Sequence, residues 1–96
     1  MRAYEMMVIL DPDTDERTVT PTMEKYLQQV LDAKGSVEKL DVWGKRRMAY
    51  DINKKSEGIY VVVNFTTTPE VEAELSRQLR LNESIMRTKT FVTDAK

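Results

Sequence analysis

The sequence contains neither cysteine nor histidine among its 96 residues. Without cysteine the chain can form no disulfide bridge and no thiolate metal site, and a reducing cytoplasm is the expected compartment. Without histidine it lacks the side chain that most often acts as general base near neutral pH and as zinc ligand. Carboxylates or lysine could still support catalysis, but the two absences favour a binding protein without a cofactor over an enzyme.

Long hydrophobic runs are also missing. No stretch approaches the roughly 18 apolar residues that a membrane helix needs. The longest run near the start, Met6–Leu10, is too short for the apolar region of a signal peptide and follows Glu5. The length, with 41% hydrophobic and 32% charged residues, predicts one globular domain over residues 1–93 and a frayed tail at residues 94–96.

Charge is nearly balanced, with a formal net charge of -1, but it is unevenly distributed. Residues 1–36 contain four cations and seven anions, residues 45–55 five cations and one anion, and residues 77–91 four cations and one anion. Two basic segments in a neutral chain are typical of a protein that meets a polyanion over a limited patch. The competing interpretation is that these charges simply lie on solvated faces.

Apolar alternation predicts a first strand over residues 2–10 and a last strand over residues 85–92. The first strand has apolar residues on both faces: Tyr4, Met6, Val8 and Leu10 on one, and Met7 and Ile9 on the other. Such a strand is expected to lie in the centre of a sheet, covered twice.

Helical spacing of apolar residues predicts two helices. The first has a stripe formed by Val19, Met23, Tyr26, Leu27, Val30 and Leu31. Thr20 before Pro21 resembles an N-cap followed by the first helical residue, although Val19 in the stripe suggests an earlier start. Lys34 and Gly35 supply the cation and the left-handed residue typical of a helix end. The second helix begins at Thr68–Pro69 and ends near Leu81, with a stripe formed by Val71, Leu75 and Leu79.

Between the helices the pattern predicts a hairpin, with strands over residues 36–52 and 59–65 and a polar turn at residues 53–58. Gly44 falls where the alternation slips, which indicates a β-bulge. The resulting order, strand-helix-strand-strand-helix-strand, predicts an α+β ferredoxin-like sandwich in which two helices cover one face of a four-stranded antiparallel sheet. The expected spatial order is strands four, one, three, two, with the strand over residues 36–52 at an edge.

That edge strand contains Trp43 and Tyr50 around three consecutive cations, Lys45, Arg46 and Arg47. Unpaired cations cannot lie in a dry core, so this segment is expected to face solvent or a partner. Prevention of aggregation could be the sole role of cations on an edge strand. However, arginine together with aromatic residues is the combination that protein interfaces favour. A partner surface is the better hypothesis.

The sheet face without helices is expected to be partly apolar, because the strand over residues 59–65 places Tyr60 and Val62 on it. Such a face is suited to a partner protein or to stacked bases, unless long side chains from the edges cover it. The aromatic signature of the common RNA-recognition module is absent from the segment GIYVVVNF. Arg77 and Arg80 could form ion pairs within the chain instead of binding a polyanion, because Glu74 and Glu83 stand at helical spacing from them.

Four segments of the sequence are characteristic in this order: MRAYEMMVILDP, VEKLDVWGKRRMAYDINK, EGIYVVVNF and ELSRQLRLNESIMRTK. Together they closely resemble the family of the sixth protein of the bacterial small ribosomal subunit, over nearly the whole chain from Met1 to about Thr90. The strings WGKRRMAY and LSRQLRLNESIMR are specific. The resemblance implies a ferredoxin-like fold without catalytic activity. It also implies binding to the central domain of small-subunit ribosomal RNA, as a heterodimer with the eighteenth small-subunit protein.

Residue roles follow from the resemblance by motif. The partner-protein interface is expected at Arg46, Arg47, Met48 and Tyr50, to which the edge-strand and open-face arguments add Trp43, Tyr60 and Val62. RNA contacts are expected first at Arg2 and Arg87, and then at Lys54, Lys55 and Lys89. No membrane and no small-molecule substrate is expected.

Three other functions stay open at this point. A regulatory domain of the same fold would bind a small ligand in an apolar pocket between protomers. A hydrolase would need an arginine and an asparagine converging on a phosphate loop, for which Asn53 and Asn82 give poor support. Self-association through the strand over residues 36–52 would follow if Arg46 and Arg47 were removed and the edge were left unprotected.

Overall fold

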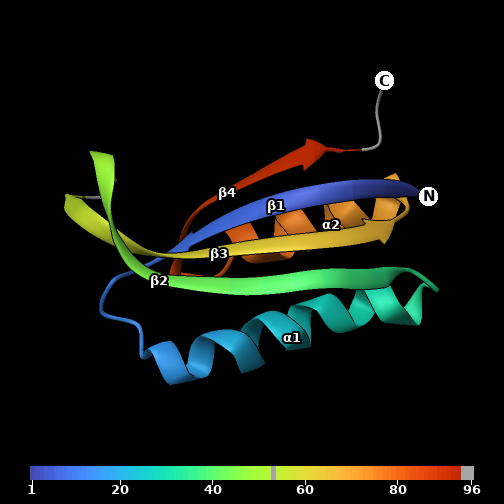
Figure 1. The fold of residues 1–96 in the computed structure, drawn as a ribbon, viewed down its shortest axis with the longest axis horizontal. Coiled ribbons are helices and arrows are strands. Elements are labelled where there is room, and N and C mark those ends of the chain that lie inside the picture. The colour runs from blue at the N-terminus through green and yellow to red at the C-terminus, as the bar shows by residue number, and fades with distance from the viewer. Residues whose placement is uncertain (53, 94–96) are drawn as a thin grey trace.

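Two helices lie on one face of a four-stranded antiparallel sheet in the computed structural model, which describes residues 1–52 and 54–93 (Figure 1). In chain order the elements are β1 (Arg2–Leu10), α1 (Glu16–Asp32), β2 (Ser36–Ile52), β3 (Lys55–Thr67), α2 (Pro69–Arg80) and β4 (Ile85–Val92). The strands follow the order β2-β3-β1-β4. The ferredoxin-like fold is therefore confirmed, with β2 at an edge. The predicted tail at residues 94–96 lies outside the described residues.

The core fills the space between the sheet and the helices. Alternation along β1 and β3 turns one set of apolar side chains inward, and Met6, Val8, Val61 and Phe65 are completely buried there. From the helices come Val19, Met23, Leu27, Val30, Leu75 and Leu79. Burial of this apolar surface is the main favourable term in folding. It leaves the opposite face of the sheet without a helical cover.

Helix α1 begins earlier than the Thr20–Pro21 pair suggests. Asp15 is the N-cap, and its side chain accepts a hydrogen bond from the backbone N–H of Arg17 at 3.0 Å. Pro21 lies inside the helix, so the predicted cap at Thr20 is wrong. The reason is burial: Val19 is completely buried, and only an earlier start brings it into the helix and onto the core.

The end of α1 also differs from the prediction. The left-handed residue is Lys34, with φ of 70°, and Gly35 does not have positive φ. Gly35 is instead a point of close approach, since a Cβ there would lie 2.3 Å from the carbonyl oxygen of Thr66. The glycine lets the start of β2 pass directly against β3.

Helix α2 has the predicted start, because the hydroxyl of Thr68 accepts a hydrogen bond from the backbone N–H of Val71 at 3.3 Å. On its surface Arg77 and Glu74 form a two-point ion pair, with N–O distances of 2.8 and 2.6 Å. The expected pairing of Arg77 with Glu74 is thus confirmed. Within residues 1–52 and 54–93, neither helix has the length and apolar character needed to cross a bilayer.

The Glu74 ion pair gives a testable pH dependence. Hydrogen bonds from Arg77 and then Gln78 lower the pKa of Glu74 from 4.5 to about 2. A lowered native pKa means that the pair stabilises the fold fully above about pH 4.5, and that this contribution is lost as the pH falls through about 2. A carboxyl NMR titration should find the low midpoint, and the Arg77→Ala variant should return it toward 4.5. An ordinary midpoint in the unaltered protein would contradict the pairing.

Candidate partner and nucleic-acid interface

The face of the sheet opposite the helices, called the open face below, takes its side chains from all four strands. The register places Ile9 of β1 between Tyr60 of β3 and Arg87 of β4. Met7 lies in the same way between Val62 and Lys89. Segments that are distant in the sequence therefore meet on this face.

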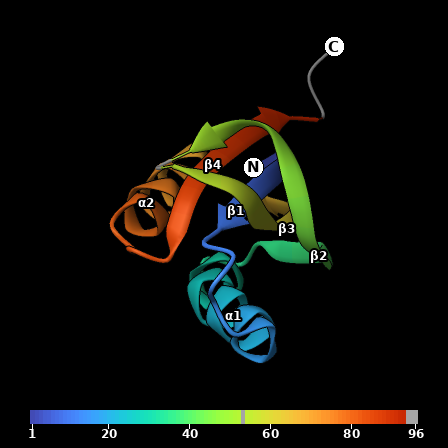
Figure 2. The same ribbon diagram turned by 90° about the vertical axis from the view of Figure 1, so that its left-hand side faces the viewer.

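The far end of the β2–β3 hairpin bends over the open face. We call residues 45–52 and 54–58 the hairpin arm. The bend begins at Gly44, whose φ of 84° and register shift opposite Tyr60 confirm the predicted bulge. Figure 2 shows the arm passing above β1 toward β4, on the side away from the helices. The predicted polar turn at residues 53–58 is too long, because β3 begins at Lys55, which pairs with Ile52; Asn53 lies outside the described residues.

Met48 holds the arm against the sheet. It is only 8% exposed, in contrast to its exposed neighbours in β2. A Cβ at Gly58 would lie 2.5 Å from Cγ2 of Ile9 and 3.7 Å from the sulfur of Met48, so these residues pack closely at this point. The alternative that side chains from an edge cover the open face is therefore correct for the end nearest the arm.

Tyr50 brings the arm to β4. Its hydroxyl accepts a hydrogen bond from Nη1 of Arg87, and the guanidinium carbon lies 5.7 Å from the centre of the Tyr50 ring. Tyr50 as a residue is 58% exposed. A cation and an aromatic surface are thus presented together, from residues 37 positions apart in the chain.

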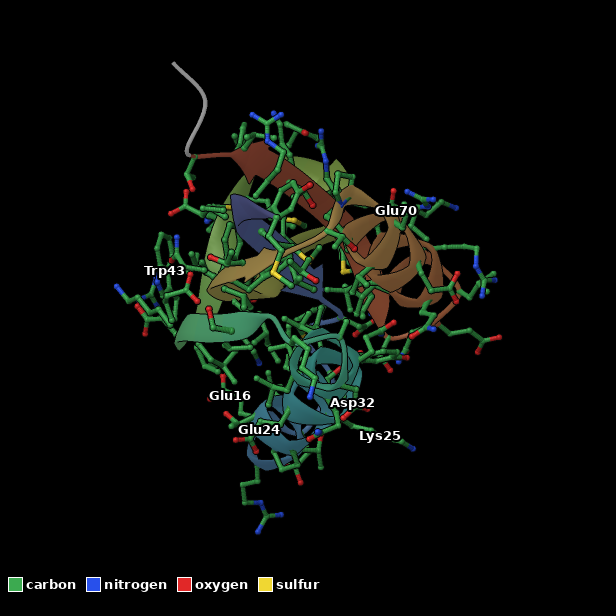
Figure 3. All side chains as sticks on the ribbon, turned by 90° about the vertical axis from the view of Figure 1, so that its right-hand side faces the viewer. Glu16, Glu24, Lys25, Asp32, Trp43 and Glu70 are labelled. Carbon is green, nitrogen blue, oxygen red and sulfur yellow. The ribbon has the colours of Figure 1, made fainter. Side chains whose placement is uncertain are left out.

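A second aromatic pair lies on the open face nearer the sheet edge. The rings of Trp43 and Tyr60 stack with centres 6.4 Å apart and planes 4° from parallel. The indole N–H of Trp43 donates to Asp41 at 3.0 Å. In Figure 3 Trp43 lies on the opposite side of the molecule from Glu70 of α2. Val62 is only 7% exposed and can contribute little contact area of its own.

Between the arm and the sheet is a hollow of about 200 Å³, called the open-face hollow below. It is lined by Met7, Ile9, Tyr50, Tyr60, Arg87 and Lys89. Beside it Lys89 lies over the ring of Phe91, with Nζ 5.3 Å from the ring centre. The lining combines apolar, aromatic and cationic side chains and includes no carboxylate.

The structure brings together only some of the residues that are predicted to contact RNA. Arg87 and Lys89 stand two residues apart on one face of β4, and both are exposed. Arg2 pairs with Thr67, five residues along β1 from the position opposite Lys89, or about 17 Å at the usual strand rise. By alternation Arg2 also belongs to the other face of the sheet.

The two remaining lysines lie at the arm. Lys54 is exposed with a φ of 64°, and Lys55 forms an ion pair with Asp13, with 3.1 Å between Nζ and Oδ2. The carboxylate of Asp13 raises the pKa of the Lys55 ammonium. Lys55 thus has a structural partner already, which makes it a weaker candidate for phosphate than Arg87 or Lys89.

Arg46 and Arg47 are exposed on the arm, and neither forms an ion pair with any described residue. The one hydrogen bond that Arg46 donates within the described residues goes to the carbonyl of Lys45, at 3.2 Å. Two unneutralised cations therefore project from the edge strand. Sequence reasoning placed Met7 and Ile9 on the opposite face of β1 from Tyr4 and Met6, but it did not recognise them as site residues and did not single out Phe91. The strand register shows that they adjoin Arg87 and Lys89.

The competing enzyme function finds no support at Asn82. Its amide nitrogen donates to the hydroxyl of Tyr26 at 2.9 Å, and its amide oxygen accepts from the backbone N–H of Ser84 at 2.9 Å. The side chain is therefore committed to a turn. Among the described residues no group of three or more Asp or Glu side chains is placed to hold a metal ion.

Comparison with known proteins gives a consistent result. The family model described as "Ribosomal protein S6" matches residues 3–92. The small ribosomal subunit protein bS6 of Pseudarthrobacter chlorophenolicus is 62% identical over 89 residues, which cover 93% of this chain and 88% of that protein. The protein of the same name from Beutenbergia cavernae is 57% identical over 95 residues, covering 99% of both chains.

Two solved structures show the same architecture. The crystal structure of 30S ribosomal protein S6 from Thermotoga maritima has a TM-score of 0.85 and 31% identity, covering 96% of this chain and 87% of that one. The C-terminal domain of the MgtC protein from Mycobacterium tuberculosis has a TM-score of 0.66 at 13% identity, covering 98% and 89%. The second likeness shows the fold alone.

Proposed function

Because the chain belongs to the ribosomal protein S6 family, we propose that it is a structural constituent of the small ribosomal subunit and not an enzyme. It works in the cytoplasm, where bacterial ribosomes are. In this proposal it binds the central domain of small-subunit ribosomal RNA, and it does so as a heterodimer with the eighteenth small-subunit protein. Residues 1–93 act as one domain.

The observation that most supports RNA binding is the exposed pair Arg87 and Lys89 beside a hollow without carboxylates. Cations near phosphates release counterions, which gives affinity that falls steeply with salt and reads little sequence. Lys54 can extend this surface around the arm, while Arg2 contacts RNA at a separate point. With a net charge of -1, the chain alone gains little affinity in this way.

The partner protein covers the edge of β2. Arg46 and Arg47 supply unneutralised donors and Trp43 an exposed aromatic surface, the combination that protein interfaces favour. Met48 shapes this surface by holding the arm, Val62 supports it from below, and Tyr50 and Tyr60 lie at its border with the open-face hollow. Binding of partner and of RNA should be coupled, because the partner adds its own positive charge next to the RNA surface.

A filter-binding titration tests this proposal. A central-domain ribosomal RNA fragment is titrated with the chain alone and with the chain together with the eighteenth small-subunit protein, at two salt concentrations. We expect weak binding by the chain alone and tight, salt-dependent binding by the pair. Equal affinity for the RNA with and without the eighteenth protein would contradict the coupling. No binding in either titration would refute the RNA function.

A further inference from the structure

We infer that the open-face hollow seats one unpaired RNA base, and that Arg87 and Lys89 hold the phosphates on either side of it. This inference rests on the proposed RNA binding and adds a base contact to what are otherwise backbone contacts. The site combines side chains that the sequence assigns to two different partners. Tyr50 and Tyr60 belong to the predicted protein interface, and the two cations to the predicted RNA contacts.

The size and lining of the hollow suit a single base. Its volume of about 200 Å³ is below the roughly 300 Å³ at which drug-sized ligand sites begin, and it is far too small for a helix. Met7 and Ile9 form an apolar floor, and Tyr50 and Tyr60 offer aromatic surface at the sides. Every base has a flat apolar face that stacks on such rings, and that stacking is worth about 1–3 kcal/mol per base.

The charges around the hollow favour a nucleotide over a protein side chain. The guanidinium of Arg87 lies beside the ring of Tyr50, and the ammonium of Lys89 beside the ring of Phe91. Cations alternate with aromatic rings in this way along grooves that hold single-stranded nucleic acid. The lining itself contains no carboxylate that would repel the phosphates entering with the base. An acidic neighbour on the open face, Glu5, lies one alternation along β1 from Met7 and accepts a hydrogen bond from the amide of Asn64 at 3.4 Å.

The arm explains why a single strand is selected. Met48 and Tyr50 lie over one end of the open face, so the hollow is a recess under the arm and not a flat platform. A base in a duplex stays stacked and paired and cannot enter such a recess. An unpaired base can turn out of its strand and insert.

Methyl NMR on the full chain provides the test, because Met7 and Ile9 both line the hollow. The chain is labelled at Met and Ile methyl groups and titrated with single-stranded tetramers of uridine or of adenosine, and separately with an RNA duplex. A stacked base should shift the Met7 and Ile9 resonances upfield, more strongly for adenosine than for uridine, and the duplex should leave them in place. Equal shifts with duplex, or none with either single strand, would overturn the inference.

A matched pair of variants separates stacking from charge. Tyr60→Phe keeps the ring and Tyr60→Leu removes it, while both leave Arg87 and Lys89 intact. We expect Tyr60→Leu to weaken binding of the adenosine tetramer about tenfold relative to Tyr60→Phe, in line with the energy of one stacked base. Equal affinities for the two variants would show phosphate contact only, and would overturn the base site.

The outcome can be separated from that of the proposed function. If the pair binds the central-domain fragment and the methyl groups do not respond to single strands, only the base site fails. If the pair does not bind the fragment either, the RNA function fails with it. If the eighteenth protein alone, without RNA, shifts the Met7 and Ile9 resonances, the hollow belongs to the protein interface and the inference is wrong.

Discussion

Replacing Arg46 and Arg47 together with alanine is expected to weaken binding to the eighteenth small-subunit protein about 100-fold. Both side chains are exposed on the edge strand, and among the described residues neither has an ion-pair partner, so their donors are available to another protein. Arginine is enriched among the minority of interface residues that cost more than about 1 kcal/mol when truncated, and a total of about 2.7 kcal/mol for two such residues corresponds to 100-fold. Isothermal titration calorimetry with the purified partner measures the change directly.

The matched control removes two cations elsewhere. Lys25→Ala with Arg80→Ala alters the net charge equally, but these exposed positions lie on α1 and α2, the helices that cover the other face of the sheet (Figure 3 labels Lys25). This control should bind the partner almost normally. Equal loss in both double variants would assign the effect to net charge and contradict a specific interface. Sedimentation of the Arg46/Arg47 variant is needed as well, because an edge strand without its cations can associate with copies of itself.

Replacing Gly35 with alanine is expected to lower the free energy of unfolding by about 3 kcal/mol, the upper range for overpacking. The added Cβ would lie 2.3 Å from the carbonyl oxygen of Thr66 and 3.0 Å from Cγ1 of Val30. Because the closest atom belongs to the backbone of β3, no side-chain rotation relieves the clash. The start of β2 would have to move away from β3. Urea denaturation, followed by circular dichroism, measures the loss.

Gly44→Ala gives the comparison for that experiment. Gly44 has φ of 84°, but its added Cβ would meet only Oε1 of Glu16, at 3.9 Å. We therefore expect Gly44→Ala to lower the free energy of unfolding by about 1 kcal/mol, through backbone strain alone. Gly35→Ala should therefore be the more damaging change, although Gly35 lacks positive φ. The reverse order would show that β2 can shift at Gly35 and that the close approach is not rigid.

Much of the fold could be predicted because it depends on local periodicity. The two-sided apolarity of β1 indicated a central strand, and Gly44 marked the bulge in β2. The Thr68 cap of α2 was likewise visible in the sequence. Where two local signals competed, the structure decided: Asp15 caps α1 and Thr20 does not, because burying Val19 outweighs the preference of Pro21 for a first helical position.

The candidate site was predictable as a set of residues but not as an arrangement. The sequence determined the family, through strings such as WGKRRMAY, and it determined which residues could bind a partner or RNA. It also determined the alternation along β1 that separates Met7 and Ile9 from the core-facing Tyr4, Met6 and Val8.

Packing across the whole molecule, and no local pattern, brings Tyr50 to Arg87, pairs Lys55 with Asp13 and separates Arg2 from the other cations. These contacts depend on how far the hairpin arm bends and on the register between strands distant in the chain. Both are set by packing over the whole sheet, as where Met48 settles near Ile9. Local spacing can identify the face on which a side chain lies, but the side chain's neighbour across the fold is a property of the packed molecule.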